Sequence, residues 1–238
     1  MLLTFEQRLS PSPFVERVWR SRSEAAGTFY SMAEPNLELV IARVQGRTKA
    51  IVRGPVTRAS VADCPADGEW LGIRLRLGVY LRGLSACSLR DHQSAVLPDL
   101  GPRAFRLGGQ RWELPTYENA ECLVARLAAA GVIAQDEVVD RALGGHVSGL
   151  GPRSLQRRFL RATGISRESL LQIERARFAA QLLRDGAAVL DVVDQAGYFD
   201  QPHLSRALRR LVGPTPAALS RGEDQLSLLY KTTPPPWT

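Results

Sequence analysis

The sequence of 238 residues has few of the side chains that build disulfide and metal sites. Its three cysteines, Cys64, Cys87 and Cys122, lie far apart, with no CxxC pair and no group of histidines beside them. This distribution disfavours a disulfide framework and a zinc site. His92 is the single histidine among the first 145 residues, so a metal site of several histidines cannot be built there. We therefore expect no metal and no cofactor.

Long hydrophobic runs are also missing. No stretch approaches the about 18 uninterrupted apolar residues of a membrane-spanning helix. The first residues, Met1 to Arg8, do not follow the basic-then-apolar order of a secretion signal. The sequence therefore predicts a cytoplasmic protein with reduced thiols and no membrane partner.

Positive charge is present throughout the chain, with a net charge of +7 and an isoelectric point near 9.9. Residues 1–135 carry 17 Lys/Arg against 13 Asp/Glu, and residues 136–221 carry 13 arginines against 9 Asp/Glu. Arginine pairs bidentately with guanine edges and phosphates, although an arginine bias also follows from GC-rich coding. This balance fits nucleic-acid binding and also a merely soluble protein, so the positions of the arginines have to decide.

The first half has the pattern of short β-strands, which we expect at Leu37–Val44, Lys49–Arg53 and Trp70–Leu77. In the third run isoleucine and leucine alternate with arginine, so that one face is buried and the other is solvated. Glycine and proline punctuate the runs as turns. The pattern predicts an antiparallel sandwich or barrel.

A helical pattern begins after Pro115. Tyr117–Ala130 places Leu123, Val124 and Leu127 on one face of a helix. That face either packs on its own domain or forms a dimer seam, and the sequence leaves both open. Helix then dominates to about residue 222, and the proline-rich residues 223–238 predict a frayed tail.

Two helices separated by a tight turn are expected near the end of this helical region. Leu190–Ala196 is followed by a Gly-Tyr-Phe turn, and Asp200 is a suitable N-cap for a helix over Gln201–Val212. The buried stripe of this helix is expected to be Leu204, Leu208 and Leu211. The opposite face presents Gln201, Arg206, Arg209 and Arg210. Such side chains reach base edges near the helix start and phosphates further along.

A similar pair of helices is expected upstream, at Asp136–Leu143 and Pro152–Arg161, where Arg153, Gln156 and Arg157 share one outer face. Arginine and glutamine pair with guanine and adenine edges. Between the two pairs, Arg167–Arg184 predicts a helix of about 18 residues, roughly 27 Å long. A rod of this length could hold the pairs near one DNA repeat apart, about 34 Å, so that both enter successive major grooves.

Four separated segments agree in order and spacing with one known family: Leu155–Gly164 (LQRRFLRATG), Ile173–Arg177 (IERAR), Ala196–Arg206 (AGYFDQPHLSR) and Gly213–Pro216 (GPTP). They closely resemble the DNA-binding domain of the AraC/XylS family of bacterial transcription regulators, over about residues 136–221. The resemblance implies two helix-turn-helix units joined by a linker helix.

By this resemblance, base contacts fall on Arg153, Gln156 and Arg157 in the first unit and on Gln201, Pro202 and Arg206 in the second. Pro202 departs from the family pattern because it has no side-chain donor, so readout there would be apolar, for example against a thymine methyl. His203 is expected to bond a phosphate or cap the turn. The full set expected to bind DNA is Arg153, Gln156, Arg157, Arg161, Gln201, Pro202, His203, Arg206 and Arg210.

The first unit departs further from the family. Gly145–Gly149 resembles an insertion in its turn, and Gly151 stands where the family usually has a capping serine.

Residues 9–101 resemble the sensor-type N-terminal domain of some relatives, through Pro13–Trp19, Glu38–Val40 and Gly72–Leu75. Such domains are similar to cupin barrels and bind an effector, dimerise, or both. Three tryptophans either line an effector pocket or, as is usual for large aromatics, belong to the core. They are Trp19, Trp70 and Trp112.

Together these observations predict an α+β protein with four parts. These are a mostly-β, cupin-like barrel at 1–115, a connecting helix at 116–134, an AraC-type double helix-turn-helix domain at 135–222 and a tail at 223–238. The expected function is sequence-specific binding of double-stranded promoter DNA as a transcription regulator, without catalysis. RNA polymerase, a small-molecule effector and a second copy of the chain stay open as further partners.

Two other functions are weighed against this one. A DNA-alkylation repair protein carries a cysteine-rich zinc domain before the same DNA-binding module, but three scattered cysteines cannot supply the four thiolates of that site. An interaction module would use the arginine faces to bind an acidic protein instead of DNA.

Overall fold

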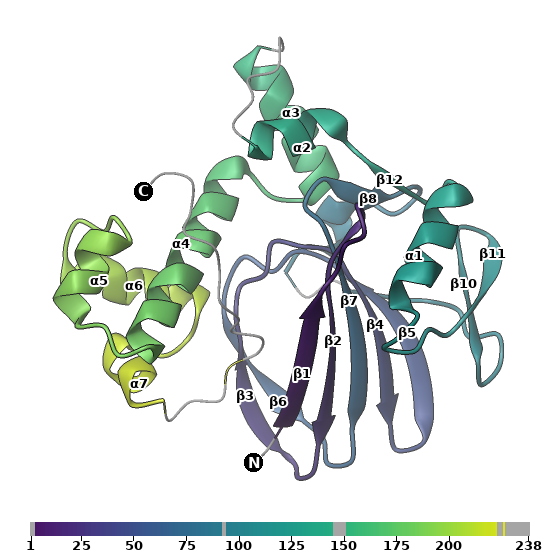
Figure 1. Ribbon diagram of the computed structural model, residues 1–238, viewed down its shortest axis with the longest axis horizontal. Helices are drawn as coiled ribbons and strands as arrows, with labels where there is room; N and C mark the ends of the chain where they lie inside the picture. The colour runs from purple at the N-terminus through teal and green to yellow at the C-terminus, as the bar shows by residue number, and fades with distance from the viewer. Residues whose placement is uncertain (1–2, 92–93, 145–150, 223–225, 227–238) are drawn as a thin grey trace. The chain divides into compact units, whose positions relative to one another are not determined.

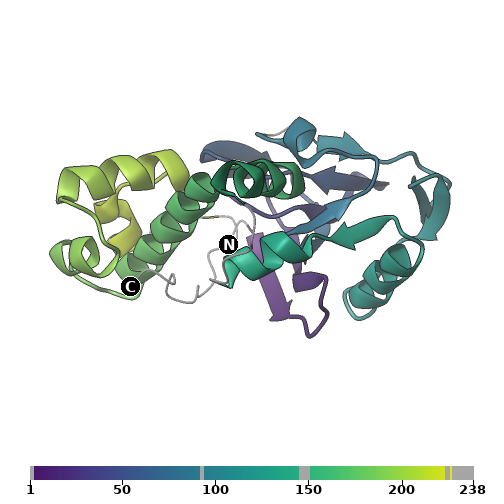
Figure 2. The same ribbon diagram turned by 90° about the horizontal axis from the view of Figure 1, so that it is seen from above.

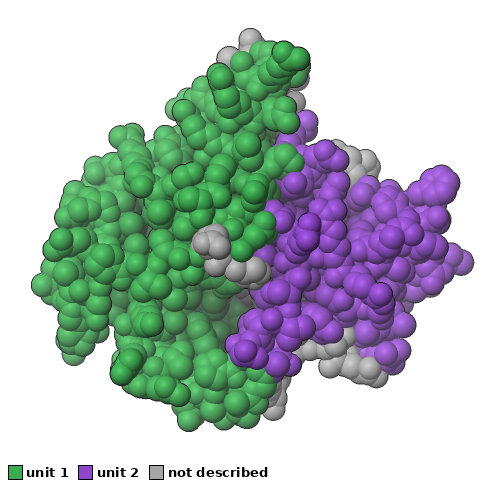
Figure 3. All heavy atoms as spheres, turned by 180° about the vertical axis from the view of Figure 1, so that it is seen from behind, with its two compact units in different colours: residues 1–27, 35–55, 64–166 green, residues 28–34, 56–63, 167–238 purple. Residues whose placement is uncertain are grey.

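The computed structural model describes residues 3–91, 94–144, 151–222 and 226. The chain divides into two compact units, and each is built from three separate stretches of the sequence (Figure 3). Unit 1 consists of residues 1–27, 35–55 and 64–166, and unit 2 of residues 28–34, 56–63 and 167–238. The insertion predicted at 145–149 lies outside the described residues, as does the predicted tail apart from residue 226.

Strands dominate up to residue 115 and helices dominate after it, which confirms the α+β class (Figure 1). The described strands are β1 Leu3–Leu9, β2 Val15–Ser23, β3 Gly27–Ser31, β4 Glu38–Val44, β5 Arg47–Arg53, β6 Ser60–Cys64, β7 Glu69–Leu75, β8 Val79–Leu81, β9 Ser94–Val96, β10 Ala104–Leu107, β11 Gln110–Glu113 and β12 Ile133–Gln135. The described helices are the 3-10 helix η1 Ala86–Leu89, α1 Ala120–Ala129, α2 Glu137–Leu143, α3 Pro152–Thr163, α4 Arg167–Arg184, α5 Val189–Gln195, α6 Gln201–Leu211 and α7 Pro216–Arg221.

Unit 1 is built on an antiparallel sheet of six strands in the order β1-β2-β7-β4-β5-β9. The three predicted strands are confirmed as β4, β5 and β7. In the register, Leu39 lies opposite Ile73 and Ile41 opposite Leu71. These cross-strand pairs put branched aliphatic side chains on one face, where they join the core of the unit.

Helix α1 packs its apolar face into that core. Leu123, Val124 and Leu127 are buried there together with residues of β2, β4 and β7. This settles the alternative that the sequence left open, since side chains already buried in their own unit cannot form a dimer seam.

The cupin-like part of the fold prediction is not confirmed, because the described strands do not form a closed barrel. They form the six-stranded sheet and three separate two-stranded sheets, β10-β11, β8-β12 and β3-β6. The physical reason lies in β3 and β6, which pair with each other and, apart from one terminal residue each, belong to unit 2.

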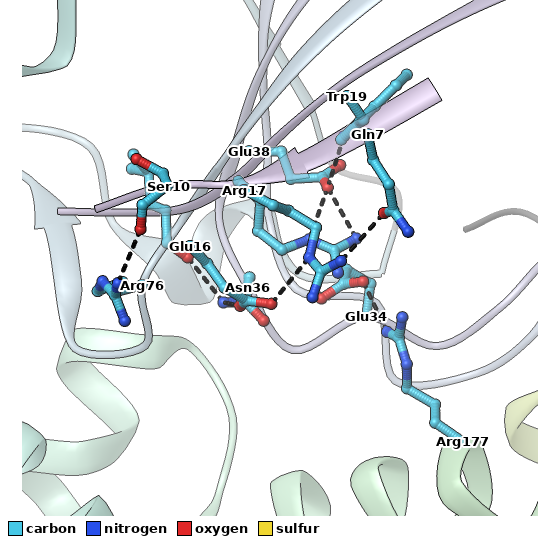
Figure 4. A network of polar contacts seen from close by, with 12 residues as sticks. Gln7, Ser10, Glu16, Arg17, Trp19, Glu34, Asn36, Glu38, Arg76 and Arg177 are labelled. Atoms are coloured by element: carbon cyan, nitrogen blue, oxygen red, sulfur yellow. Dashed lines mark hydrogen bonds and ion pairs between the residues drawn. The ribbon is translucent and has the colours of Figure 1, made fainter. Parts of the chain in front are cut away.

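The sheet of unit 1 also buries charged side chains. Glu38 on β4 accepts hydrogen bonds from Trp19 Nε1 at 3.2 Å and from Arg74 Nε at 3.0 Å, and all three residues are buried (Figure 4). Arg17 on β2 donates to Gln7 on β1 at 3.0 Å. Burial of an ion pair is tolerated when its polar atoms are satisfied in this way. Strand β1 lies at the edge of the sheet with mostly exposed or half-buried residues, and β2 buries the polar Arg17, so neither strand follows a hydrophobic alternation.

Unit 2 groups α4 to α7 with β3 and β6. Both ribbon views show α5, α6 and α7 gathered beside the long helix α4, which runs over the predicted residues 167–184 (Figure 1 and Figure 2). Helix α4 contributes Ile173, Ala176, Ala180 and Leu183 to the interior, all fully buried. In the part of the chain that the structure describes, no helix is long and apolar enough to span a membrane.

Candidate nucleic-acid interface

The first predicted pair of helices, α2 and α3, is tied together by one aspartate. Asp136 is the N-cap of α2, and its Oδ1 accepts hydrogen bonds from the N–H groups of Val138 at 3.1 Å and Val139 at 3.3 Å. The same carboxylate pairs with Arg158 on α3, with 2.7 Å between Nε and Oδ2. The buried Asp136 side chain therefore starts α2 and fixes α3 against it.

Helix α3 separates an apolar side from a basic side. Phe159 and Ala162 are buried, and Leu155 is half-buried. The four α3 residues predicted to bind DNA are exposed and form no hydrogen bond or ion pair with another described residue. They are Arg153, Gln156, Arg157 and Arg161. Their donors are therefore free for an outside partner.

The end of α3 is anchored in unit 1, where the helix packs against η1 and β8. The Cys87 thiol donates to the carbonyl oxygen of Leu160, with an S···O distance of 3.3 Å. Gly164 ends the helix at a φ of 79°, and a Cβ at this position would lie 2.7 Å from the Ala86 carbonyl oxygen. Glycine is required there by both the backbone conformation and the close approach.

The second predicted pair, α5 and α6, has the expected helix-turn-helix geometry. Gly197 turns the chain after α5 with a φ of 66°. Asp200 caps α6, because its Oδ1 accepts a hydrogen bond of 2.6 Å from the N–H of His203. Pro202 lies in the first turn, where a missing N–H costs nothing. The N-cap and the start of α6 predicted from the sequence are confirmed.

Helix α6 is strongly two-sided. Its buried stripe is the predicted one, Leu204, Leu208 and Leu211. The other side carries exposed residues whose side chains make no hydrogen bond or ion pair with any described residue: Gln201, Pro202, Arg206, Arg209 and Arg210. Each helix pair thus presents free arginine and glutamine donors on a helix whose opposite face is fixed in a core.

His203 organises the turn before α6. Its Nδ1 accepts a hydrogen bond from the N–H of Phe199 at 3.4 Å, and its ring meets the edge of Tyr198 at a centroid distance of 5.1 Å. Arg175 of α4 stacks 4.5 Å over the Tyr198 ring. Burial raises the pKa of Tyr198, and Arg175 opposes that rise. Because Nδ1 accepts this bond, Nε2 is the ring nitrogen of His203 left for an outside partner.

Phe199 is a candidate contact that sequence reasoning missed. An apolar residue directly before an N-cap usually packs against the fourth helical residue, here Leu204. Phe199 does not follow that rule, since 89% of its surface is exposed. The position before Asp200 could have drawn attention to Phe199, but its exposure could not be read from local pattern.

The three tryptophans have different environments. Trp19 and Trp112 are buried, whereas Trp70 lines a cavity of about 880 Å³ in unit 1. Phe5 and Tyr117 add further aromatic surface to this cavity. Its lining also includes Arg22 and Arg103, which pair with no carboxylate among the described residues.

The cysteines are free thiols, with Cys64 buried and Cys87 and Cys122 exposed. Within the described ranges, no three His, Cys, Asp or Glu side chains gather as they would around a metal ion.

Comparison with known proteins agrees with the helical geometry. Residues 146–222 match the family described as a helix-turn-helix domain. The chain is 34% identical over 77 residues to the HTH-type transcriptional regulator RipA of Corynebacterium glutamicum, a match that covers 32% of this chain and 23% of RipA. No solved structure matches.

The matched region contains the linker helix α4 and both exposed arginine faces, and it ends at Gly222, directly after α7. The resemblance noted in the sequence is therefore confirmed over this segment: residues 146–222 are a helix-turn-helix domain of the AraC type.

Proposed function

We propose that this chain is a transcription regulator that binds promoter DNA sequence-specifically through residues 135–222. The observation that carries the proposal is the repeated design of α3 and α6. Each buries one face and exposes arginine and glutamine side chains without partners among the described residues. Two such helices in one AraC-type domain are suited to two major grooves.

Base contacts are assigned to Arg153, Gln156 and Arg157 on α3 and to Gln201 and Arg206 on α6. Arginine and glutamine in these positions pair with guanine O6/N7 and adenine N6/N7, and each good bidentate pair contributes about 1–3 kcal/mol of discrimination. Phosphate contacts are assigned to three further donors, which fix the position of the helices on the duplex. They are Arg161, His203 and Arg210.

An apolar contact accompanies them at the start of α6. Phe199 and Pro202 are both exposed beside Gln201. Neither offers a side-chain hydrogen bond, but apolar groups recognise the thymine methyl in the major groove. We assign this pair to a thymine next to the base read by Gln201.

The cavity beside Trp70 is the proposed effector site. Aromatic side chains that stack on a ring and arginines that pair with a carboxylate suit a small molecule with an apolar ring and an anionic group. Binding of such a compound to the full chain should raise its Tm, and Trp70→Ala should abolish the rise. Absence of any stabilising compound of this class would count against effector control.

The experiment for the DNA-binding proposal is selection of sites from random duplex DNA with the full chain. We expect two short motifs about one helical turn apart. The Arg157→Ala/Arg206→Ala double variant should lose both motifs, and Arg210→Ala should weaken binding to all sequences alike. Arg111→Ala, which removes an exposed arginine of β11, is the matched control and should keep both. Enrichment of no sequence, with and without effector, would contradict the proposal.

A further inference from the structure

The last turn of α6 is held by chain segments that come from the N-terminal third of the sequence. Residues 28–34 and 56–63, which include most of β3 and β6, belong to the same compact unit as α4 to α7. We infer that these two segments, named the brace below, position α6 for DNA readout. The inference rests on the proposed function, because α6 is the second reading helix.

The backbone of the brace completes the hydrogen bonding of α6. The last carbonyl groups of a helix have no partner within the helix. The Leu211 carbonyl accepts a hydrogen bond from the N–H of Ala33, and the Arg210 carbonyl accepts one from the N–H of Ala59, both at 2.8 Å. The brace therefore acts as the C-terminal cap of the reading helix.

An ion pair fixes the brace to the linker helix. Arg177 of α4 donates to Glu34 Oε2 at 2.7 Å and to the Ala33 carbonyl at 3.3 Å. Only 1% of the Arg177 side chain and 14% of the Glu34 side chain are exposed. Glu34 and Val56 exchange two backbone hydrogen bonds of 2.8 and 2.7 Å, which join the two segments of the brace. Removing one member of a buried pair leaves an uncompensated charge.

An aromatic contact fixes the turn after α6. Gly213 has a φ of 114°, and a Cβ at this position would lie 2.4 Å from Cδ1 of Tyr30. The Tyr30 ring of β3 therefore packs directly on the Gly213 backbone. The backbone caps, the ion pair and this contact meet at the same end of α6, opposite the end that carries Gln201 and Pro202.

This geometry makes Glu34 and Arg177 positioning residues for DNA readout by α6, in the second helix-turn-helix unit. They should not affect readout by α3, because α3 belongs to unit 1. The half-site read by each helix is identified with Arg157→Ala for α3 and Arg206→Ala for α6.

The test measures binding of the full chain to three duplexes: the selected site, the site with the α6 half scrambled and the site with the α3 half scrambled. In Glu34→Gln, preference for the intact α6 half-site should fall about tenfold or more, the effect of losing one good base contact. Preference for the α3 half-site should stay unchanged. Glu24→Gln, which neutralises an exposed glutamate of unit 1, is the matched control and should change neither.

Rescue separates positioning from general damage. Glu34→Asp keeps a carboxylate beside Arg177 and should retain most of the α6 preference that Glu34→Gln loses. An unchanged α6 preference in Glu34→Gln would overturn the inference, as would equal loss at both half-sites.

Hydrogen exchange gives a readout that needs no DNA. Glu34→Gln should speed exchange of the amides in the last turn of α6 and leave those of α3 unchanged. A wild-type chain that selects no DNA sequence would contradict the proposed function. Unchanged exchange in α6 would separately contradict the brace.

Discussion

The two helix-turn-helix units use different contacts to start and position their exposed helices, α3 and α6. In the second unit, a glycine turn and an aspartate N-cap start α6, and backbone hydrogen bonds from Ala33 and Ala59, which lie next to β3 and β6, complete its last turn. In the first unit, α3 starts at Gly151 without a side-chain cap, and its position depends on the Arg158–Asp136 pair and on η1. Local sequence therefore defines the start of α6 well, whereas the placement of α3 depends more on tertiary contacts.

The largest expected effect tests whether compact units 1 and 2 unfold independently of each other. Phe159→Ala should cost about 3–5 kcal/mol and Leu208→Ala about 2–5 kcal/mol, because each leaves a cavity in a buried core. Native-state hydrogen exchange should show faster exchange in unit 1 for the first variant and in unit 2 for the second. Similar acceleration throughout the chain for both variants would show that the units unfold together.

A smaller effect concerns Phe199, since no described residue of the first helix-turn-helix unit is an exposed aromatic. Phe199→Ala should weaken preference at a single base pair by about 1–2 kcal/mol, the contribution of an apolar contact partly buried on binding. Competition binding against sites altered one pair at a time measures it. Leu190→Ala removes another exposed apolar side chain, on α5, and should leave the base preferences alone. An equal change in base preference in both variants would show that Phe199 does not contact a base pair.

The caps offer a direct contrast between the units. Asp200→Ala should lower stability by about 1 kcal/mol, because the N–H of His203 loses its acceptor. Gly151→Ser should raise it by a few tenths of a kcal/mol, since its extended backbone and the open space around it accept a capping side chain. Chemical denaturation measures both. A loss of stability in Gly151→Ser would mean that α3 needs its glycine for another reason.

The smallest effect is a pH dependence confined to unit 1. A hydrogen bond from Arg8 lowers the pKa of Glu121 on α1 below its ordinary value, and the Nη2–Oε2 distance of the pair is 2.8 Å. A carboxyl with a lowered pKa in the folded state contributes stability above its unfolded pKa and loses it as pH falls through the folded value. Wild type should therefore exceed Glu121→Gln in Tm at neutral pH, and the difference should vanish in acid. A difference that persists at low pH would assign the effect to packing.

The elements of the helical region follow closely from local patterns. The 3.6-residue periodicity and the caps predict α4 at its observed bounds and the leucine stripe of α6. Exposure of the predicted reading residues could also be inferred, because each lies opposite an apolar stripe.

The remaining features depend on contacts between distant residues. Strand β1 is the edge strand of the sheet and is largely exposed, and on β2 the polar Arg17 is buried through its hydrogen bond to Gln7, so neither strand shows a simple hydrophobic alternation. Partners such as Glu34 and Arg177 leave no periodic signal. The same reason explains the missing barrel, since nothing local to β3 and β6 shows that they belong with the helices.

The brace also sets an order of events during synthesis. Glu34 and Arg177 are separated by 143 residues. At about 5–20 residues per second, the ribosome delivers Arg177 roughly 7–29 s after Glu34. Throughout that interval the N–H groups of Ala33 and Ala59 lack the α6 carbonyl groups that accept their hydrogen bonds in the folded chain. The C-terminal end of α6 is therefore assembled from early and late parts of the polypeptide, and it is complete only when translation is nearly over.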